Sequence, residues 1–388
     1  MNPATTSTAT TTGTRDHAVV LGASMAGLLA ARVLAEHYWH VTVVDRDTLD
    51  PDPVRPRRGV PQGGHVHAIL GRGQQALEEL LPGLTDELTG RGAPLGDQLG
   101  DARLFFGGHR VRRVHSGLPL LCASRPLLED AVRRRVAQTC GVDLVPRCEL
   151  VGLETSADLR RVTGVRVRRE GGGEQPLKAV LVVDATGRGS RIPNWLGALG
   201  LPVPAQERVR IGLGYATRTY RARPGGVAGD LGIVCAPTPP GGRGGVLSVL
   251  EGDRWMVTLA GVLGDHPPVD PAGFEDFARS LPEPDIHDAL ADAEPLDDPV
   301  PFRFPAGVRR HYERLSRFPD GLLVLGDAFC SLNPIYGQGM TVAALEALEL
   351  RAQLRRGRPL RPRAFPRRIA RIVDGPWEMA AGGDLAFP

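Results

Sequence analysis

The pattern of apolar and polar positions near the start of the chain predicts a β-α-β unit. The segment "HAVVLGASMAGLLAARVLAEHYWHVTVVDRD" opens with an apolar strand that ends at Leu21. An Ala- and Leu-rich helix is expected from about Met25 to His37, and a second strand ends at Asp45. Strand, helix and strand in this order predict parallel strands joined by a right-handed crossover.

Two later apolar runs predict buried strands that end in glycine-containing turns. The run "KAVLVVDATGRGSR" has its turn at Asp184 to Arg191, and "DGLLVLGDAFCSLNPIYGQGM" leads from a short strand into an amphipathic helix, "MTVAALEALELRAQLRR". Between them, residues 201 to about 305 contain strands such as "RIGLGYATRTY" and "RWMVTLAGVL", separated by proline and glycine loops. That composition is typical of an inserted, largely antiparallel sheet.

The predicted fold class is therefore α/β, with a parallel-sheet domain and an inserted, mostly antiparallel β-sheet domain. The first domain is expected to be discontinuous, over residues 15–95, 120–200 and 306–388. The inserted domain is expected to take residues 96–119 and 201–305. Residues 1–14 are Thr- and Ala-rich and are expected to be a disordered tail.

Composition argues against several kinds of partner. The 47 Lys and Arg against 44 Asp and Glu leave a net charge of only +3, so no nucleic acid or other polyanion is implied. The five cysteines are odd in number and include no C-x-x-C pair, which argues against a disulfide framework and against a metal site. No apolar run approaches the roughly 18 to 20 residues that span a bilayer, and the N-terminus lacks the features of a signal peptide. A soluble, cytoplasmic protein without integral membrane contact is expected.

The first turn, "GASMAG" at Gly22 to Gly27, has the chemistry of a dinucleotide site. It departs from G-x-G-x-x-G because Ser24 stands where the second glycine is expected. A first glycine permits the tight turn, a small residue admits a pyrophosphate, and Gly27 lets the helix pack closely on the sheet. Asp45 is placed at the end of the second strand to accept hydrogen bonds from a ribose. The alternative is an ordinary strand-to-helix turn.

A purely structural interpretation is possible for each of the other two turns. Asp184 to Arg191 can be a helix N-cap with glycines for turning. In the third turn, Asp327 can accept from sugar-like hydroxyls, and Gly337 to Gly339 open a helix whose N–H groups can face an anion. A buried capping Asp with turn glycines explains those residues as well, but it does not explain the order of all three motifs.

In this order the three motifs resemble the FAD-dependent single-component monooxygenases of the aromatic hydroxylase type. Within that group, "RRGVPQGGHVHAIL", "DATGRGSR" and "GDAFCSLNPIYGQGMTVA" look most like the actinobacterial polyketide (polyether) epoxidases, and the last also resembles squalene epoxidase. The resemblance covers about residues 16 to 385. It implies a Rossmann-like FAD-binding domain and an inserted substrate-binding domain.

The resemblance also implies roles for the matching positions. The ADP half of FAD would be held by Gly22, Ser24, Gly27 and Asp45. The phosphates or ribityl chain would meet Arg57, Arg125 and Asp327, although both arginines can also be ordinary surface charge. The isoalloxazine ring would be flanked by Pro334 and Tyr336, and its N1/C2=O edge would receive backbone N–H groups from Gly337, Gln338, Gly339 and Met340.

The implied reaction is carried by the cofactor. In such enzymes reduced flavin and O2 give a C4a-hydroperoxide, whose distal oxygen passes to an alkene or an activated ring, so no catalytic side chain is named. Epoxidation of an apolar polyketide or isoprenoid-like alkene in specialised metabolism is preferred. No second glycine fingerprint marks a separate nicotinamide domain. The flavin would therefore be reduced either by NAD(P)H that docks transiently at the cleft, as the resemblance to aromatic hydroxylases implies, or by a partner flavin reductase.

Several alternatives stay open. The same fold serves aromatic-ring hydroxylases, isoprenoid reductases and halogenases, and an inactive or truncated flavoprotein is a further alternative. A halogenase is disfavoured, because the only lysine, Lys178, begins a strand and no W-x-W-x-I-P signature is present. His65 and His67 are expected to pack or to form a hydrogen bond near the flavin and not to bind metal. Trp195 and Trp255 are more typical of core than of a substrate pocket.

Overall fold

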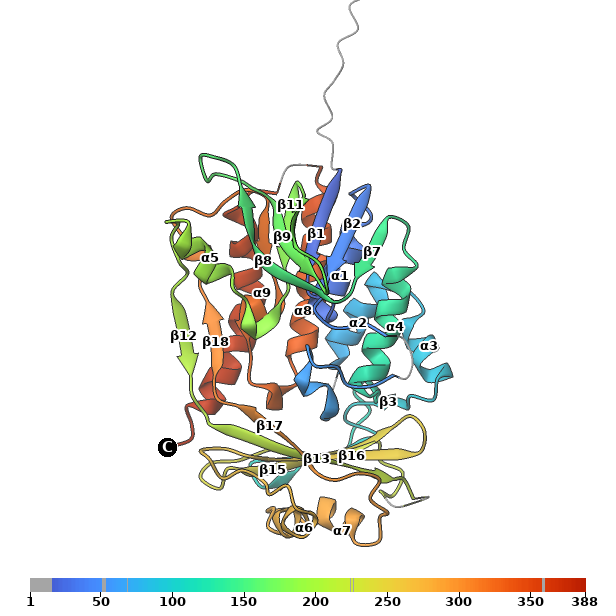
Figure 1. The fold of residues 1–388 in the computed structure, drawn as a ribbon. Helices are drawn as coiled ribbons and strands as arrows, with labels where there is room; N and C mark the ends of the chain where they lie inside the picture. The colour runs from blue at the N-terminus through green and yellow to red at the C-terminus, as the bar shows by residue number, and fades with distance from the viewer. Residues whose placement is uncertain (1–15, 51–53, 68, 224, 226, 358–359) are drawn as a thin grey trace, which may run out of the picture.

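The computed structural model describes residues 16–50, 54–67, 69–223, 225, 227–357 and 360–388, arranged as two stacked layers (Figure 1). The predicted tail at residues 1–14 lies outside these residues. One layer contains a parallel sheet with helices around it, and the other contains a larger, mainly antiparallel sheet with two helices on its far side. The α/β fold with an added antiparallel sheet is confirmed.

Five parallel strands form the first sheet, in the order β19-β11-β1-β2-β7. Their bounds are β1 (His17–Leu21), β2 (His40–Val44), β7 (Val142–Val145), β11 (Leu181–Asp184) and β19 (Leu322–Val324). Near-continuous apolar runs form these strands because helices cover the sheet. Leu21 is in register with both Val44 and Asp184, and Asp184 with Val324. The residues that follow three of the strands therefore meet at one edge.

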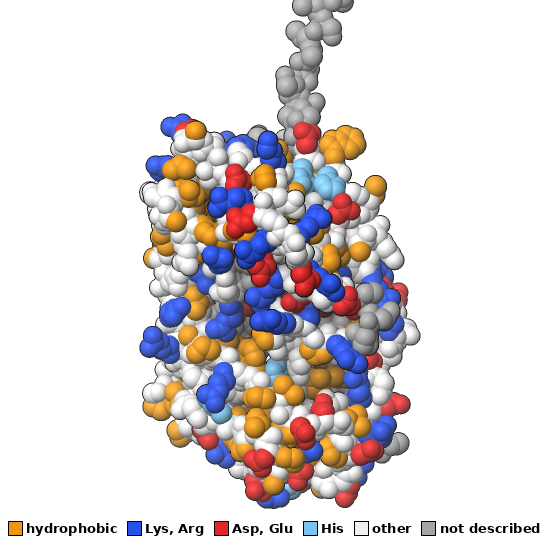
Figure 2. All heavy atoms as spheres, viewed as in Figure 1, with side chains coloured by type: hydrophobic (Ala, Val, Ile, Leu, Met, Phe, Trp, Pro, Cys, Tyr) orange, Lys and Arg blue, Asp and Glu red, His pale blue; other side chains and the backbone are white. Residues whose placement is uncertain are grey.

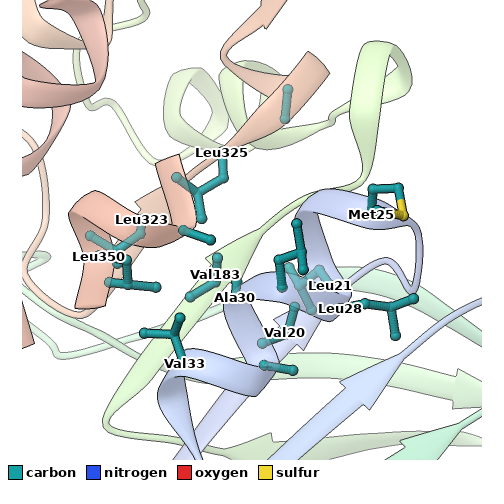
Figure 3. Packing of buried hydrophobic residues seen from close by; sticks show 14 of the residues in the cluster. Val20, Leu21, Met25, Leu28, Ala30, Val33, Val183, Leu323, Leu325 and Leu350 are labelled. Atoms are coloured by element: carbon teal, nitrogen blue, oxygen red, sulfur yellow. The ribbon is translucent and has the colours of Figure 1, made fainter. Parts of the chain in front are cut away.

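Seven helices accompany this sheet in the described part of the chain. They are α1 (Met25–Leu34), α2 (Gly71–Leu80), α3 (Leu84–Gly90), α4 (Arg125–Ala137), α5 (Ile192–Ala198), α8 (Gly339–Arg355) and α9 (Ala364–Asp384). Helix α1 ends three residues before the expected His37, because a turn begins after Leu34. Figure 3 shows how Leu28 and Ala30 of α1 pack with Val183, Leu323 and Leu350. This contact joins the start of the chain to a segment three hundred residues later.

Three smaller sheets and five short 3-10 helices complete this layer. The sheets are β8 (Cys148–Thr155) with β9 (Val162–Arg169) and β10 (Glu174–Lys178); β12 (Gln206–Val209) with β18 (Gly307–Arg310) and β20 (Cys330–Ser331); and β3 (Leu95–Asp97) with β6 (Pro119–Leu121). The 3-10 helices are η1 (Pro61–Gly64), η2 (Gly187–Gly189), η3 (Tyr312–Arg314), η4 (Gly326–Ala328) and η5 (Pro334–Tyr336).

The second layer is a seven-stranded sheet in the order β17-β13-β16-β15-β14-β4-β5. Its strands are β4 (Ala102–Phe106), β5 (His109–Arg110), β13 (Leu213–Arg221), β14 (Gly232–Cys235), β15 (Arg243–Leu250), β16 (Arg254–Gly261) and β17 (Val300–Phe304). All neighbours are antiparallel except β14 and β4. Helices α6 (Pro271–Arg279) and α7 (Asp285–Leu290) pack on one face.

Alternation along β13 and β16 separates the two faces of this sheet. Trp255 and Tyr220 are buried with Phe274 of α6 in the outer core. The preference for Trp255 as a core residue is therefore confirmed. The opposite face carries Thr217 and Thr258, and it faces the parallel-sheet layer through η1.

Candidate functional site

The three predicted turns contact one another at the carboxyl edge of the parallel sheet. Gly22 has φ +97°, and a Cβ there would lie 2.6 Å from the carbonyl oxygen of Ala185, at the second turn. Gly326 has φ +61°, and a Cβ there would lie 2.7 Å from Cβ of Ala26, at the start of α1. Only glycine permits both the backbone geometry and these close approaches. Segments far apart in sequence thus form one continuous surface.

The first turn is held by Asp45. The backbone N–H of Ala23 donates to Oδ2 of Asp45 at 2.6 Å, and the N–H of Asp47 donates to Oδ1 at 2.9 Å. Ser24 precedes α1 but provides no side-chain cap. The first N–H groups of α1 are therefore available to an anion at the positive end of the helix dipole.

Arg57 is half-buried in a cluster of carboxylates, with 14% of its side chain exposed, so the alternative of a solvated surface arginine is wrong. Its Nε donates to Glu129 at 2.6 Å, its Nη1 donates to Asp47 at 2.8 Å and to Asp45 at 3.3 Å, and its Nη2 donates to the carbonyl oxygen of Ala23 at 2.7 Å. Burial opposes the charge of Arg57, but the carboxylates of Glu129 and Asp45 outweigh it and raise its pKa. The guanidinium links α4, β2 and the first turn.

Arg125 is buried on the other side of Glu129. Its Nε and Nη2 donate to Oε2 of Glu129 at 3.2 and 3.1 Å, and Nη2 also donates to Oγ of Ser24 at 3.0 Å. Burial acts to raise the pKa of Glu129, but Arg125 and Arg57 outweigh burial and lower it. One ionised carboxylate therefore holds both predicted arginines at the start of α1.

A pocket of about 280 Å³ opens beside this cluster. Its charged lining comes from Asp50, Arg55, Arg57, Arg125, Glu129 and Arg133, and its apolar lining includes Leu49, Val54 and Val60. On the face drawn in Figure 2, basic and acidic side chains are interspersed and not segregated. The basic side chains at the pocket are therefore a local feature, consistent with the small net charge.

The second turn is organised by Asp184. Its Oδ1 accepts from the backbone N–H and the hydroxyl of Thr186 at 3.0 and 2.6 Å, and its Oδ2 accepts from Oγ of Ser190 at 2.6 Å. These bonds hold the turn internally, but they do not make it a helix N-cap, because Thr186 and Arg191 occupy the N-cap positions of η2 and α5 without a side-chain cap bond. Arg188 projects from the turn, and its guanidinium lies 4.2 Å from the ring centre of Phe304.

Arg310 joins the second turn to the third. Its Nη2 donates to the carbonyl oxygen of Arg188 at 3.0 Å, and its Nη1 donates to those of Asp327 and Ala328 at 3.2 and 3.1 Å. Burial raises the pKa of Asp327, and the positive charges of Arg188, Arg125 and Arg310 partly oppose that effect. Asp327 therefore lies where both turns meet.

Helix α8 supports the third turn with a buried acid. Oε2 of Glu346 accepts from the N–H of Gly326 at 2.6 Å, and its Oε1 has no hydrogen-bond partner among the described residues. Burial raises the pKa of Glu346 to about 8, and nearby Asp327 adds to the shift. The raised pKa favours the protonated form of Glu346 at neutral pH.

The segment that precedes α8 is fixed by the end of α9. Asp384 accepts from Nδ2 of Asn333 at 2.7 Å and from the hydroxyl of Tyr336 at 3.1 Å. Gly337 has φ +66°, and Gln338 occupies the cap position of α8 without a side-chain cap. Pro334 begins η5, while Gly339 and Met340 form the first turn of α8. The start of α8 thus leaves backbone N–H groups without a side-chain cap.

His65 and His67 lie where the two layers meet. Nδ1 of His65 is 2.7 Å from Oγ1 of Thr217, and Thr217 is 2.7 Å from Oγ1 of Thr258. The ring of His65 lies 5.2 Å from Phe302 and 5.8 Å from Tyr215, measured between ring centres. Burial lowers the pKa of His65 to about 4. Within the described ranges, no group of three or more His, Cys, Asp or Glu side chains is placed to hold a metal ion.

The sequence did not point to five residues that hold the site together through hydrogen bonds or ion pairs with other segments. These are Glu129, Glu346, Asp384, Thr217 and Thr258. Glu129 stands four residues after Arg125 on a predicted helix, and that spacing was a signal for an ion pair. The other four had no comparable signal, because each contacts a segment far away in the chain.

Comparison with solved structures identifies the class of fold. The chain matches PqsL, a probable FAD-dependent monooxygenase from Pseudomonas aeruginosa, with a TM-score of 0.68 and 16% identity over 95% of this chain and 94% of that one. It matches a mutant of 2-methyl-3-hydroxypyridine-5-carboxylic acid oxygenase with a TM-score of 0.67 and 22% identity, over 95% and 90%. The flavin-dependent brominase Bmp2 gives 0.68 and 16%, over 92% and 83%. The fold is that of the FAD-dependent monooxygenases.

A relative of closer sequence gives the family. Protein Rv3254 from Mycobacterium tuberculosis (strain ATCC 25618 / H37Rv) is 36% identical over 389 residues, which cover 96% of this chain and 81% of that protein. The chain belongs to the family of Protein Rv3254. No protein-family model matches the chain. None of the helices in the described part of the chain is both long and apolar enough to cross a membrane.

Proposed function

We propose that the chain binds FAD along the edge where the three turns meet. The observation that carries this proposal is the contact among the turns that follow β1, β11 and β19. Such an edge, with the start of α1 beside it, is where α/β sheets bind nucleotides. The uncapped starts of α1 and α8 supply N–H groups for two separate parts of the cofactor, the pyrophosphate and the N1/C2=O edge of the flavin ring.

The ADP half is assigned to the first turn. The carboxylate of Asp45 accepts from the ribose, while Gly22, Ser24 and Gly27 let the pyrophosphate approach the start of α1. Arg57 and Arg125 supply positive charge beside the pocket of about 280 Å³. Glu129 holds both guanidinium groups in place before the phosphates arrive, which lowers the entropy lost when they bind.

The flavin half is assigned to the third turn. Asp327 receives the ribityl hydroxyls or the pyrophosphate, and Pro334 and Tyr336 flank the ring. Gly337, Gln338, Gly339 and Met340 place the start of α8 at the N1/C2=O edge, where its dipole stabilises negative charge. Asp384 restrains this segment through Asn333 and Tyr336.

The proposed reaction is the epoxidation of an apolar polyketide or isoprenoid-like alkene in specialised metabolism. Bound FAD, reduced by NAD(P)H or by a partner reductase, supplies the activation of O2 for transfer of one oxygen atom. The chain orients the alkene and excludes water between the seven-stranded sheet and the α8 start. Support comes from the motif resemblance and from the apolar cluster in which Ile335 packs with Leu213, Phe302 and Phe304.

Incubation with FAD, NADPH, a linear polyene and ¹⁸O2 tests the reaction. The expected product is an epoxide with one labelled oxygen. Aromatic hydroxylation is the second candidate, favoured by the stacked pair of Tyr215 and Phe302, whose ring centres lie 5.7 Å apart. A naphthol in the same assay separates the two candidates. An unlabelled product from both substrates, with the flavin fully reduced, would contradict monooxygenation and favour the reductase or inactive alternatives.

A further inference from the structure

Three hydrogen bonds across the layer junction determine which ring nitrogen of His65 carries the proton. Thr217 and Thr258 are directly opposite each other on β13 and β16, and both are buried. The backbone N–H of Val66 donates to Oγ1 of Thr258 at 3.1 Å. Thr258 also contacts Thr217 at 2.7 Å, and Thr217 contacts Nδ1 of His65 at 2.7 Å.

The direction of donation along these hydrogen bonds follows from the number of hydroxyl protons that find an acceptor. If Thr258 donates to Thr217, then Thr217 donates to Nδ1 of His65, and both hydroxyl protons are used. In the reverse direction the hydroxyl of Thr258 has no acceptor among the described residues. A buried donor without a partner costs about 1 to 3 kcal/mol. In the first direction only the Nε2–H of the ring lacks a partner among the described residues, whereas in the reverse both the hydroxyl of Thr258 and the lone pair of Nε2 lack one. The first direction is therefore favoured, and it places the proton of the ring on Nε2.

The Nε2–H of His65 is left as a free donor. It has no hydrogen-bond partner in the described part of the chain, although only 3% of the residue is exposed. The ring contacts Phe302 and Tyr215, and Ile335 of η5 packs against the cluster that contains Tyr215. The donor therefore lies beside apolar side chains that reach the segment assigned to the flavin ring.

Charge near His65 restricts the acceptor that this donor can serve. Burial alone accounts for the lowered pKa of His65, with no contribution from a neighbouring charge. His67, which bonds to the carbonyl oxygen of His65, has its own pKa lowered to about 3 by burial and by the charge of Arg125. Both rings are uncharged at pH 7. No charged side chain is a hydrogen-bond partner of His65 among the described residues, so an ionised ligand group at its Nε2 would be desolvated at a large cost.

We infer that the Nε2–H of His65, oriented by Thr217 and Thr258, positions an otherwise apolar substrate through one uncharged oxygen acceptor, such as a carbonyl, ether or hydroxyl oxygen. This inference rests on the proposed function for the identity of the site as a substrate site. It adds a specificity rule: a pure hydrocarbon binds less tightly than the same skeleton with one oxygen acceptor.

Two probes of matched shape test the rule with the full chain and bound FAD. 2-Acetylnaphthalene carries a carbonyl oxygen, and 2-isopropenylnaphthalene replaces it with a methylene group. Their affinities are measured from the change in flavin absorbance. A single hydrogen bond predicts that the ketone binds about 3- to 10-fold more tightly to the wild type.

A set of variants separates the loss of the hydrogen-bond donor from a general effect on folding. His65→Phe and Thr217→Val are expected to remove the preference for the ketone, and His65→Gln, which keeps an N–H donor, is expected to retain part of it. Thr219→Val is the matched control, because Thr219 lies two residues along β13 and its hydroxyl makes no hydrogen bond to a described residue. Equal affinities in the wild type, or a preference that survives in His65→Phe, would overturn the inference.

Labelling the histidines with ¹⁵N supplies a readout that does not need the cofactor. The signal that is lost in His65→Gln identifies His65, and it is expected to show Nε2–H in the wild type and to shift when the ketone is added. An Nδ1–H signal would overturn the inference. If FAD does not bind but the Nε2–H signal still responds to the ketone alone, the proposed function fails and this inference stands.

Discussion

Replacing Glu129 with Gln tests the charge cluster at the start of α1. Only 4% of Glu129 is exposed, and its carboxylate is the shared acceptor of Arg57 and Arg125. The amide of Gln has one acceptor oxygen, so one of the two guanidinium groups must face an N–H group. Arg57 keeps Asp45 and Asp47, whereas Arg125 keeps only Oγ of Ser24.

These contacts set the expected loss in the free energy of unfolding. Removing one partner of a buried ion pair costs about 3 to 5 kcal/mol. The lower end applies because Arg57 retains two carboxylates, so Glu129→Gln is expected to lower the free energy of unfolding by about 3 kcal/mol at pH 7. Glu87→Gln is the matched control, since Glu87 pairs with Arg135 at 2.6 Å on a half-buried surface. That pair is worth at most about 1 kcal/mol.

Urea unfolding followed by circular dichroism measures both variants, with and without FAD. The pH dependence gives a second check, because the pKa of Glu129 is lower in the folded protein than its ordinary value of 4.5. Its stabilisation is present above pH 4.5 and is lost as the pH falls through the folded pKa. The gap between wild type and Glu129→Gln should therefore narrow in acid. A loss no larger than that of Glu87→Gln, or a gap independent of pH, would refute the account of the cluster.

Three further predictions concern other parts of the site. Gly27→Ala should lower the free energy of unfolding by several kcal/mol, because its Cβ would overlap the carbonyl oxygen of Gly22, whereas a Cβ at Gly339 meets nothing within 4 Å. Gly339→Ala should unfold like the wild type in urea and bind FAD more weakly in a fluorescence titration; normal FAD affinity would contradict its assignment. The pKa of His65 is about 4 in the folded protein against an ordinary value of 6.5, so about 3 kcal/mol of unfolding free energy should be lost as the pH falls from 6.5 to 4. In His65→Gln the unfolding free energy measured in urea should depend less on pH over this range. Glu346 has the opposite sign: its pKa of about 8 against 4.5 means that stability is lost as the pH rises from 4.5 to 8, by at most roughly 4 kcal/mol. The free energy of unfolding of Glu346→Gln should rise relative to that of the wild type between pH 5 and pH 8. If the two proteins show the same dependence of unfolding free energy on pH, a protonated Glu346 is contradicted.

Features that depend on neighbouring residues were predictable from the sequence. The apolar runs gave the parallel strands β1, β2, β11 and β19, and the glycines marked the turns that follow three of them. The close contact of Gly22 with the second turn follows once the strands are placed in parallel register. These features rest on the period of the pattern and on backbone geometry, which short segments encode.

Features that depend on distant side chains were not predictable in the same way. The partners Arg57 and Glu129 are separated by 72 residues, and His65 and Thr217 by 152. A buried arginine and a solvated one look alike in sequence, because burial is decided by whether a carboxylate arrives from another element. The role of Asp384 was hidden for the same reason, since its partners Asn333 and Tyr336 belong to another segment.

A titration of the purified chain with FAD, monitored by quenching of flavin fluorescence, tests the central claim most directly. The account predicts one FAD per chain with a micromolar or tighter dissociation constant, and affinity lowered about tenfold or more in Asp45→Ala and Asp327→Ala, each of which removes a carboxylate proposed to bind the cofactor. Glu87→Gln should bind FAD as the wild type does. Failure of the folded wild type to bind FAD, or equal affinity in all four proteins, would contradict the account.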